Sequence, residues 1–268
     1  APLLEAIKRA DDKGLIFVSA AANDGKNNDT TEVYPANNGF PNSITVSASG
    51  PNDEKPSWSN FGTARVHVAA PGLNILSTLP ANKYGELSGT SMATPLVSGL
   101  VALLKAQDPS LTGAQIRAIL QTTGAKAQIQ TACNCRVDAL TAVDAVMSKK
   151  MTVVPAAASI ATGETVTFAV WSGAAPFKFV SSNPAIATVT DAGVLTAASN
   201  GAAVITVTDS TGKTASTLDI NVGAKPSSPN PPPPDDGGGG GGGECPIGNP
   251  ALCEIICGIQ PDLPFCQK

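Results

Sequence analysis

The sequence predicts an α/β fold built on a parallel sheet, followed by an all-β sandwich. Up to about residue 149, short continuous apolar runs alternate with segments whose apolar residues recur at helical spacing, as expected for buried parallel strands and their connecting helices. From about residue 151 the chain is rich in Val, Thr, Ala and Ser, and turn signals separate short alternating runs, which is typical of a sandwich. The 268 residues, 42% of them apolar, suffice for roughly one or two packed domains.

The first domain should begin with a helix over residues 3–12, in which Leu4, Ile7 and Ala10 share one face. Gly14 ends this helix. The continuous apolar run at residues 15–18 predicts a buried strand of a parallel sheet, and residues 44–48 and 66–70 resemble two further strands.

Three helices are predicted after these strands. Apolar periodicity follows Pro95, a residue suited to the first turn of a helix. Thr112 and Gln115 form a capping box ahead of the second helix. The third should span residues 137–147. Its apolar residues at helical spacing are Leu140, Val143 and Met147.

The second domain is expected over residues 151–223. Its stretches 181–189, 193–197 and 201–208 together resemble the bacterial Ig-like family 2 domain (BIG2). This resemblance implies an Ig-like β-sandwich that serves as an accessory module of surface and secreted proteins.

Two segments follow the sandwich. Residues 224–244 contain runs of Pro and then Gly, which predicts a flexible linker. Residues 245–268 form a cysteine-rich tail with four of the six cysteines, Cys245, Cys253, Cys257 and Cys266. We favour disulfides and an oxidising compartment over a metal knuckle, because the cysteine spacing fits no standard zinc pattern. Cys133 and Cys135 lie too close for easy mutual pairing, so pairing with tail cysteines is the favoured alternative, ahead of a redox role for the two thiols.

Charge and hydropathy exclude several classes of protein. The net charge is −4, and Lys and Arg are scattered rather than clustered, so we expect no nucleic-acid partner. No apolar run reaches the ~18 residues of a membrane span. Charged residues interrupt residues 1–10, which therefore do not resemble a signal peptide, and we expect a processed or cut end there.

Ser91 is the candidate nucleophile. Small residues, Gly89 and Thr90 among them, surround it and would let a substrate backbone approach. A serine hydroxyl needs exposure, a base and hydrogen-bond donors for the oxyanion. Because a helix follows, Ser91 should lie near its N-terminus, where free N–H groups favour negative charge and the Ser91 N–H could serve as a donor.

Three motifs in this region resemble those of the subtilisin-like serine proteases (subtilases, peptidase S8 family). Leu-Ser-Gly-Thr-Ser-Met-Ala-Thr-Pro at residues 87–95 is similar to the nucleophile motif of the family. Ala-Ala-Pro-Gly at 69–72 is similar to the preceding strand and loop, and Val-Ser-Ala-Ala-Ala-Asn-Asp-Gly at 18–25 to the segment with the oxyanion asparagine. The resemblance implies that residues 1–149 are the C-terminal part of a subtilase catalytic domain.

The resemblance also implies a role for each matching residue. Ser91 is similar to the acyl-forming nucleophile and Asn23 to the side-chain donor of the oxyanion hole. Ala20, Ala21 and Ala22 would form one wall of the S1 pocket. Val33 falls where relatives often have glycine at the pocket base, so we expect a shallow S1 pocket that prefers small or medium P1 residues.

The catalytic Asp and His of the family lie N-terminal to the oxyanion asparagine, and no matching residues precede Asn23. The one histidine, His67, is expected to be an ordinary strand histidine. The resemblance therefore implies a secreted serine endopeptidase whose Asp and His come from a missing N-terminal fragment of the same precursor, so that this chain is inactive in isolation. The alternative is an inactive subtilase-derived surface, scaffold or assembly protein.

The chemistry of the family requires no cofactor, although structural calcium is possible. Asn27, Asn28, Asp29 and Glu32 could suggest a cation site. We favour a solvated loop, because no spaced series of acidic ligands appears.

Overall fold

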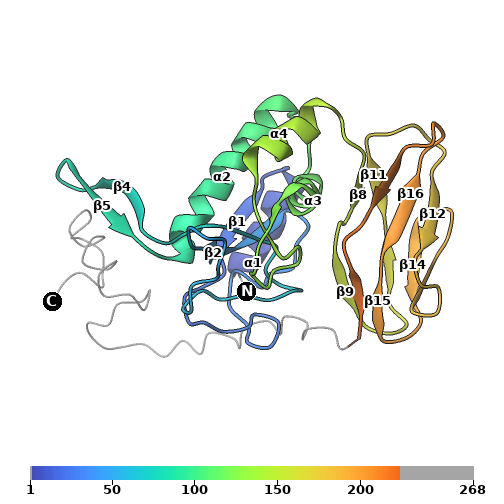
Figure 1. Ribbon diagram of the computed structural model, residues 1–268, viewed down its shortest axis with the longest axis horizontal. Coiled ribbons are helices and arrows are strands. Elements are labelled where there is room, and N and C mark those ends of the chain that lie inside the picture. Colours follow the sequence, from blue (N-terminus) through green and yellow to red (C-terminus); the bar gives the residue numbers. More distant parts are fainter. Residues whose placement is uncertain (1, 224–268) are drawn as a thin grey trace. The chain divides into compact units, whose positions relative to one another are not determined.

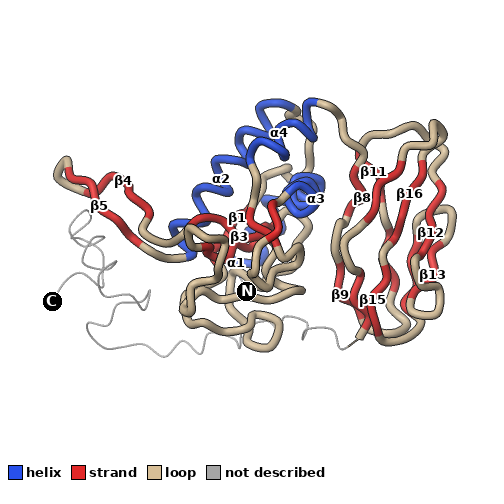
Figure 2. The backbone as a smooth tube through the Cα atoms, viewed as in Figure 1, coloured by secondary structure: helices blue, strands red, loops and turns tan. Residues whose placement is uncertain are grey.

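The computed structural model describes residues 2–223. The expected linker, 224–244, and the cysteine-rich tail, 245–268, lie outside the described residues. Figure 1 shows the order of elements and Figure 2 their types. Through residue 147 the elements are α1 (Pro2–Asp12), β1 (Phe17–Ala20), β2 (Ser43–Ser49), β3 (Val68–Pro71), β4 (Ile75–Leu79), β5 (Lys83–Leu87), α2 (Thr90–Gln107), α3 (Gly113–Thr123), β6 (Ala125–Lys126), β7 (Cys135–Arg136) and α4 (Ala139–Met147).

The predicted parallel sheet is present. Five strands lie in the order β1-β2-β3-β7-β6, and the pairs β1–β2, β2–β3 and β3–β7 are parallel. All residues of β2 are buried, although its sequence Ser-Ile-Thr-Val-Ser-Ala-Ser alternates small polar and apolar residues, so its small polar side chains are buried as well. Helix α2 packs against β1, β2 and β3, so its first turn lies at the carboxyl ends of these strands.

The helices match the predictions except in two details. The capping box is confirmed: Thr112 Oγ1 accepts from the Gln115 N–H and Gln115 Oε1 accepts from the Thr112 N–H. The predicted start of α2 is wrong, because the helix begins at Thr90 and Pro95 lies inside it. In α4 the residues that pack inward are Ala142, Ala145 and Val146, whereas Leu140 and Met147 are exposed.

A disulfide corrects the cysteine prediction. Cys133 and Cys135 are bonded to each other, with their Cα atoms 5.1 Å apart. Asn134 between them has a φ of +47°, a left-handed conformation that Asn tolerates better than most residues and that turns the chain tightly enough for the bond. Both cysteines are buried.

Short strands build the second domain, as predicted. They are β8 (Thr152–Val154), β9 (Ala158–Ile160), β10 (Thr165–Thr167), β11 (Ala169–Trp171), β12 (Lys178–Ser181), β13 (Ala187–Val189), β14 (Val194–Ala197), β15 (Gly201–Ala203), β16 (Ile205–Thr208), β17 (Thr214–Ser216) and β18 (Ile220–Val222). All their pairings are antiparallel except β9–β18. Their inward residues, such as Phe179, Leu195 and Ile205, form a separate hydrophobic core. No helix among residues 2–223 combines the length and apolar character that a membrane crossing requires.

Candidate active site

Ser91 is the second residue of α2 and is exposed, whereas Gly89 and Thr90 before it are buried. The Gly89 N–H donates to the Gly72 carbonyl over 2.8 Å, which ties the start of the helix to the end of β3. A Cβ at Gly72 would lie 2.8 Å from the Gly89 carbonyl oxygen and 2.7 Å from the Ala48 side chain. Glycine is therefore required at residue 72 for this close approach, a role that the motif alone did not assign.

Neither the hydroxyl nor the N–H of Ser91 forms a hydrogen bond with another residue in the described part of the chain. The N–H belongs to the first turn of α2, whose N–H groups have no acceptor inside the helix. The helix dipole adds a favourable field for negative charge at this end. Ser91 thus combines an exposed hydroxyl with an available donor on the same residue.

Asn23 follows β1 and is fixed by Thr90. Its Oδ1 accepts from the Thr90 N–H over 2.9 Å and from Thr90 Oγ1 over 3.0 Å. Because a backbone N–H can only donate, this contact settles which end of the amide faces Thr90. The Nδ2 donor then lies on the Gly89 side, 3.5 Å from the place of a Cβ on that glycine. The uncharged amide donor of Asn23 is thereby held beside Gly89, two residues before Ser91.

The segment before Asn23 contains the three alanines predicted to line a substrate pocket. Ala21 is buried, whereas Ala20 and Ala22 are partly exposed. Ala22 has a φ of +89°, which is strained for a residue with a Cβ. Its carbonyl accepts from the Asn60 N–H over 3.0 Å, so a residue remote in sequence holds this conformation.

Buried asparagines support the site, a role that no sequence motif predicted. Asn28 Nδ2 donates to the Ala21 carbonyl over 3.0 Å, and Asn60 Nδ2 donates to Asn28 Oδ1 over 2.9 Å. Asn37 Nδ2 donates to the Asn28 carbonyl, and the Asn37 N–H donates to the Val33 carbonyl, both over 2.7 Å. These bonds connect the alanine segment to the loop that carries Val33.

The reading of residues 27–32 as a solvated loop is therefore wrong for two of its members. Asn28 is 1% exposed and fully used in hydrogen bonds. The Asp29 carboxylate accepts from the N–H groups of Thr63, Ala64 and Arg65 at 2.7–3.2 Å. Both residues fix loops. No group of three or more His, Cys, Asp or Glu residues that could hold a metal ion occurs within residues 2–223, and structural calcium stays a prediction.

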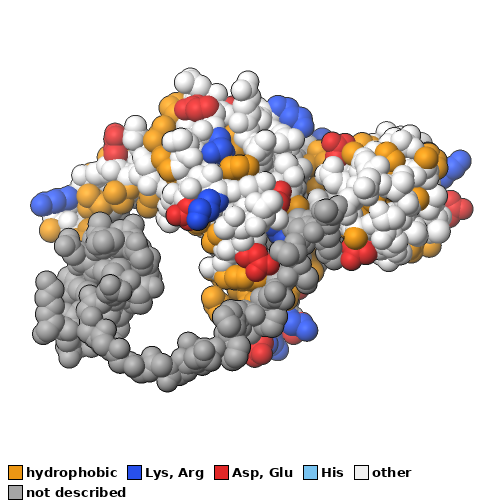
Figure 3. Space-filling model, turned by 90° about the horizontal axis from the view of Figure 1, so that it is seen from below, with side chains coloured by type: hydrophobic (Ala, Val, Ile, Leu, Met, Phe, Trp, Pro, Cys, Tyr) orange, Lys and Arg blue, Asp and Glu red, His pale blue; other side chains and the backbone are white. Residues whose placement is uncertain are grey.

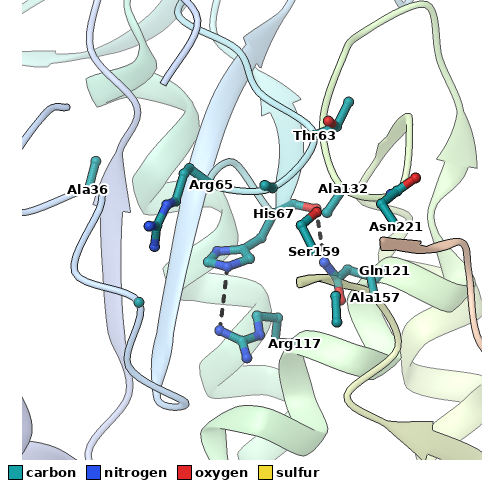
Figure 4. Close-up of a pocket in the computed structure, with 13 residues that line it drawn as sticks. Ala36, Thr63, Arg65, His67, Arg117, Gln121, Ala132, Ala157, Ser159 and Asn221 are labelled. Atoms are coloured by element: carbon teal, nitrogen blue, oxygen red, sulfur yellow. Dashed lines mark hydrogen bonds between the residues drawn. The ribbon is translucent and has the colours of Figure 1, made fainter. Parts of the chain in front are cut away.

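His67 lies immediately before β3, which begins at Val68, so the predicted position of His67 inside a strand is wrong by one residue. Its Nδ1 accepts from the Thr45 N–H over 2.8 Å, and its N–H donates to the Thr45 carbonyl. Burial, reinforced by repulsion from Arg117 and Arg65, holds the pKa of His67 well below 6.5. The imidazole lies in a cavity with Arg117 (Figure 4), and neither Ser91 nor Asn23 lines that cavity.

Comparison with known families agrees with this geometry. The model of the subtilase family matches residues 1–144, more than half of the chain. The chain belongs to the subtilase family. Within this subtilase, residues 165–211 also match the intimin immunoglobulin-like domain, so the all-β part is Ig-like.

Individual relatives are bacterial proteases. The chain is 40% identical over 118 residues to subtilisin NAT of Bacillus subtilis subsp. natto. The matched residues cover 44% of this chain and 30% of the relative. It is 39% identical over 123 residues to subtilisin Savinase of Lederbergia lenta, covering 46% of this chain and 44% of the relative. This subtilase thus spans less than half the length of the relatives it matches. Among solved structures, a protease from Pseudoalteromonas arctica is 33% identical with a TM-score of 0.48, over 53% of this chain and 46% of the other.

Proposed function

We propose that the protein is a serine endopeptidase in which Ser91 attacks the scissile carbonyl and forms an acyl-enzyme. Asn23 Nδ2 and the Ser91 N–H would hold the developing oxyanion. The observation that carries this proposal is the double contact of Asn23 Oδ1 with Thr90, which leaves the amide donor beside Gly89 and Ser91. A preorganised donor of this kind stabilises the charge without reorganising during the reaction.

Protein or peptide substrates would bind beside the alanine segment. We propose that Ala20, Ala21 and Ala22 line the S1 pocket, that Gly89 and Thr90 flank the scissile bond, and that Val33 narrows the pocket base. The hydrogen bonds through Asn28 and Asn37 support this arrangement, because they couple the Val33 loop to Ala21. A branched side chain at the base favours small or medium P1 residues.

The base and its orienting carboxylate would come from an N-terminal fragment of the same precursor, which completes a catalytic domain whose C-terminal part is residues 1–149. Two features support this. Strand β1 is an edge strand within the part of the chain that the structure describes, with a row of backbone groups available for a further strand. Leu15, just before it, is 61% exposed.

The β4–β5 hairpin is the second such feature. It projects from the sheet (Figure 1) and carries Leu76 and Tyr84, which are 65% and 73% exposed. Hydrophobic side chains gather over the hairpin at the left of Figure 3. Apolar patches of this kind mark surfaces that a partner covers.

The alternative is an inactive subtilase-derived scaffold, and the position of His67 favours it for this chain alone. His67 is the one histidine of the chain, and its Nδ1 already accepts a hydrogen bond from a backbone N–H.

We propose that the protein is secreted and associates with the cell surface. Two features support this proposal: the Cys133–Cys135 disulfide, because disulfides persist in oxidising compartments, and the Ig-like module.

The test uses the complete gene in its native host. The purified protein is treated with a fluorophosphonate probe and separated under denaturing conditions. The proposal expects two polypeptides, with the label on this chain, lost in Ser91→Ala and kept in Ser98→Ala, a control on the same helix. One unlabelled polypeptide would favour the scaffold instead.

A further inference from the structure

A cavity of about 150 Å³ lies beside His67 (Figure 4), and neither Ser91 nor Asn23 lines it. This space admits several water molecules or one small polyatomic ion. It is bordered by the segment before β3, by α3, and by strands β9 and β18. The polar side chains that line it belong to Thr63, Arg65, His67, Arg117, Gln121, Ser159 and Asn221.

The ionisable side chains that line the cavity are all basic. Two arginines and a histidine border the cavity, and none of its lining residues is acidic. Figure 4 shows the imidazole of His67 with the guanidinium groups of Arg65 and Arg117 near it. Arg117 Nη1 lies 3.4 Å from His67 Nε2 and donates to the carbonyls of Phe40 and Ser43.

Arg117 keeps donor capacity that these contacts do not use. Its three contacts all involve Nη1, and no carboxylate within residues 2–223 forms an ion pair with it. A guanidinium offers five N–H donors in a planar fork that matches an oxyanion. Burial lowers the pKa of Arg117 to about 10, partly offset by Asp11, so the group stays charged at neutral pH.

Neutral donors complete the lining. The side chains of Ser159 and Asn221 form no hydrogen bond with other described residues, so both can donate into the cavity. The Asp29 carboxylate accepts hydrogen bonds from the backbone of residues 63–65 and does not line the cavity, and neither does Asp11, the carboxylate that acts on the charge of Arg117.

We propose that this cavity binds a small oxyanion, such as phosphate, sulfate or a carboxylate, through Arg117, with Ser159 and Asn221 as neutral donors. The site is independent of the proposed protease chemistry.

Anion binding should couple to protonation of His67. The charged groups that face the imidazole are Arg117 of α3 and Arg65 of its own segment, and both repel a proton there. An anion beside them screens this repulsion, so the pKa of His67 should rise on binding. By linkage, the affinity for the anion should increase as pH falls below neutrality.

In the assembled protein, the ring Cε1–H resonance of His67, the one histidine of this chain, is identified by its absence from His67→Gln and is followed by NMR from pH 4.5 to 8. The titration is done in sodium chloride and in sodium phosphate, sulfate or acetate at equal ionic strength. We expect at least one oxyanion to raise the apparent pKa of His67 by about half a unit or more, with saturation. Which anion acts distinguishes a tetrahedral from a carboxylate ligand. Identical titrations in all four salts, or a saturable shift with calcium chloride instead, would overturn the proposal.

Variants separate binding from folding. Arg117→Gln should abolish the anion-induced shift of the His67 pKa. Arg117→Lys keeps a positive charge but loses the planar fork of guanidinium donors, so it should weaken the affinity for the anion about tenfold. Arg9→Gln, an exposed arginine in α1, is the matched control and should leave it unchanged. Ser159→Ala removes one donor without touching the contacts of Arg117 and should weaken binding several-fold. An anion shift that survives Arg117→Gln would place the ion elsewhere and contradict the assignment.

Discussion

Thr90 holds Asn23 through two hydrogen bonds, from its backbone N–H over 2.9 Å and from its hydroxyl over 3.0 Å. Both bonds end on Asn23 Oδ1, so they define the direction of the opposite end of the amide. Thr90 is fully buried at the first position of α2. The residue next to the nucleophile therefore orients the donor that would face the oxyanion.

Replacing Thr90 by Val should test this orientation, because it keeps the backbone N–H and the branched shape but removes the hydroxyl. Loss of one neutral hydrogen bond costs about 1 kcal/mol, so we expect the rate of fluorophosphonate labelling of the assembled protease to fall roughly fivefold to tenfold. Thr90→Ser, which retains the hydroxyl, should label at close to the normal rate. Equal rates for all three proteins would show that the Thr90 hydroxyl does not position Asn23.

Asn23→Ala should lower kcat far more than it changes KM. Removing the equivalent oxyanion donor from subtilisin costs on the order of 10²–10³ in kcat, and the same range is expected here. Steady-state kinetics on a peptide substrate measures the split, with Asn52→Ala in an exposed turn as the control. A rise in KM with unchanged kcat would assign Asn23 to ground-state binding.

Val33→Gly should widen the S1 pocket and move the P1 preference toward Phe and Tyr. A P1 library of peptide substrates measures this preference in both proteins. A strong preference of the unmodified protein for Phe or Tyr would refute the role of Val33 as the residue that narrows the pocket.

Ala22→Gly should stabilise the fold, because the φ of +89° at Ala22 is favourable only for glycine. Relief of this strain is expected to raise the free energy of unfolding by about 1 kcal/mol, measured from the urea midpoint. Ala20→Gly, in strand β1, is the control and should lower stability instead. A lower urea midpoint for Ala22→Gly would mean that the alanine methyl packs better than it strains.

The stability of the fold should depend on pH through His67. Its pKa lies below 6.5 in the folded state, so the unfolded state binds more protons as pH falls below that value. Stability should therefore be constant above about pH 6.5 and should decrease below it, by up to about 1.4 kcal/mol per pH unit.

Urea midpoints at pH 7.5 and pH 5 check this dependence, in chloride buffers without oxyanions. His67→Gln cannot be protonated and should lose less stability than the unmodified protein between these values. If both proteins lose the same stability, the acid sensitivity arises from other groups.

The features that could be predicted from the sequence are those that depend only on residues close together in the chain. The capping box at Thr112 and Gln115, the buried run that became β2, and the motif around Ser91 each occupy one short segment, so residue type and spacing were sufficient. The start of α2 was missed because proline is typical of the first turn of a helix, whereas Pro95 is the sixth residue of α2, where it removes one backbone N–H donor.

Contacts between distant segments could not be predicted in this way. Asn28 and Asp29 resemble a polar surface loop, and only their partners Asn60 and Thr63, more than thirty positions away, reveal them as structural. The Cys133–Cys135 bond depends on the backbone conformation of Asn134, which residue spacing does not specify. The cavity at His67 combines residues from both domains and has no sequence signature.

The most direct test of the central claim is the location of the covalent label. Protein from the native host is treated with a fluorophosphonate, digested, and analysed by mass spectrometry. We expect one modified peptide, with the phosphonyl group on Ser91, and a labelling rate that falls about a hundredfold or more in Asn23→Ala. No modification, or modification confined to a serine other than Ser91, would contradict it.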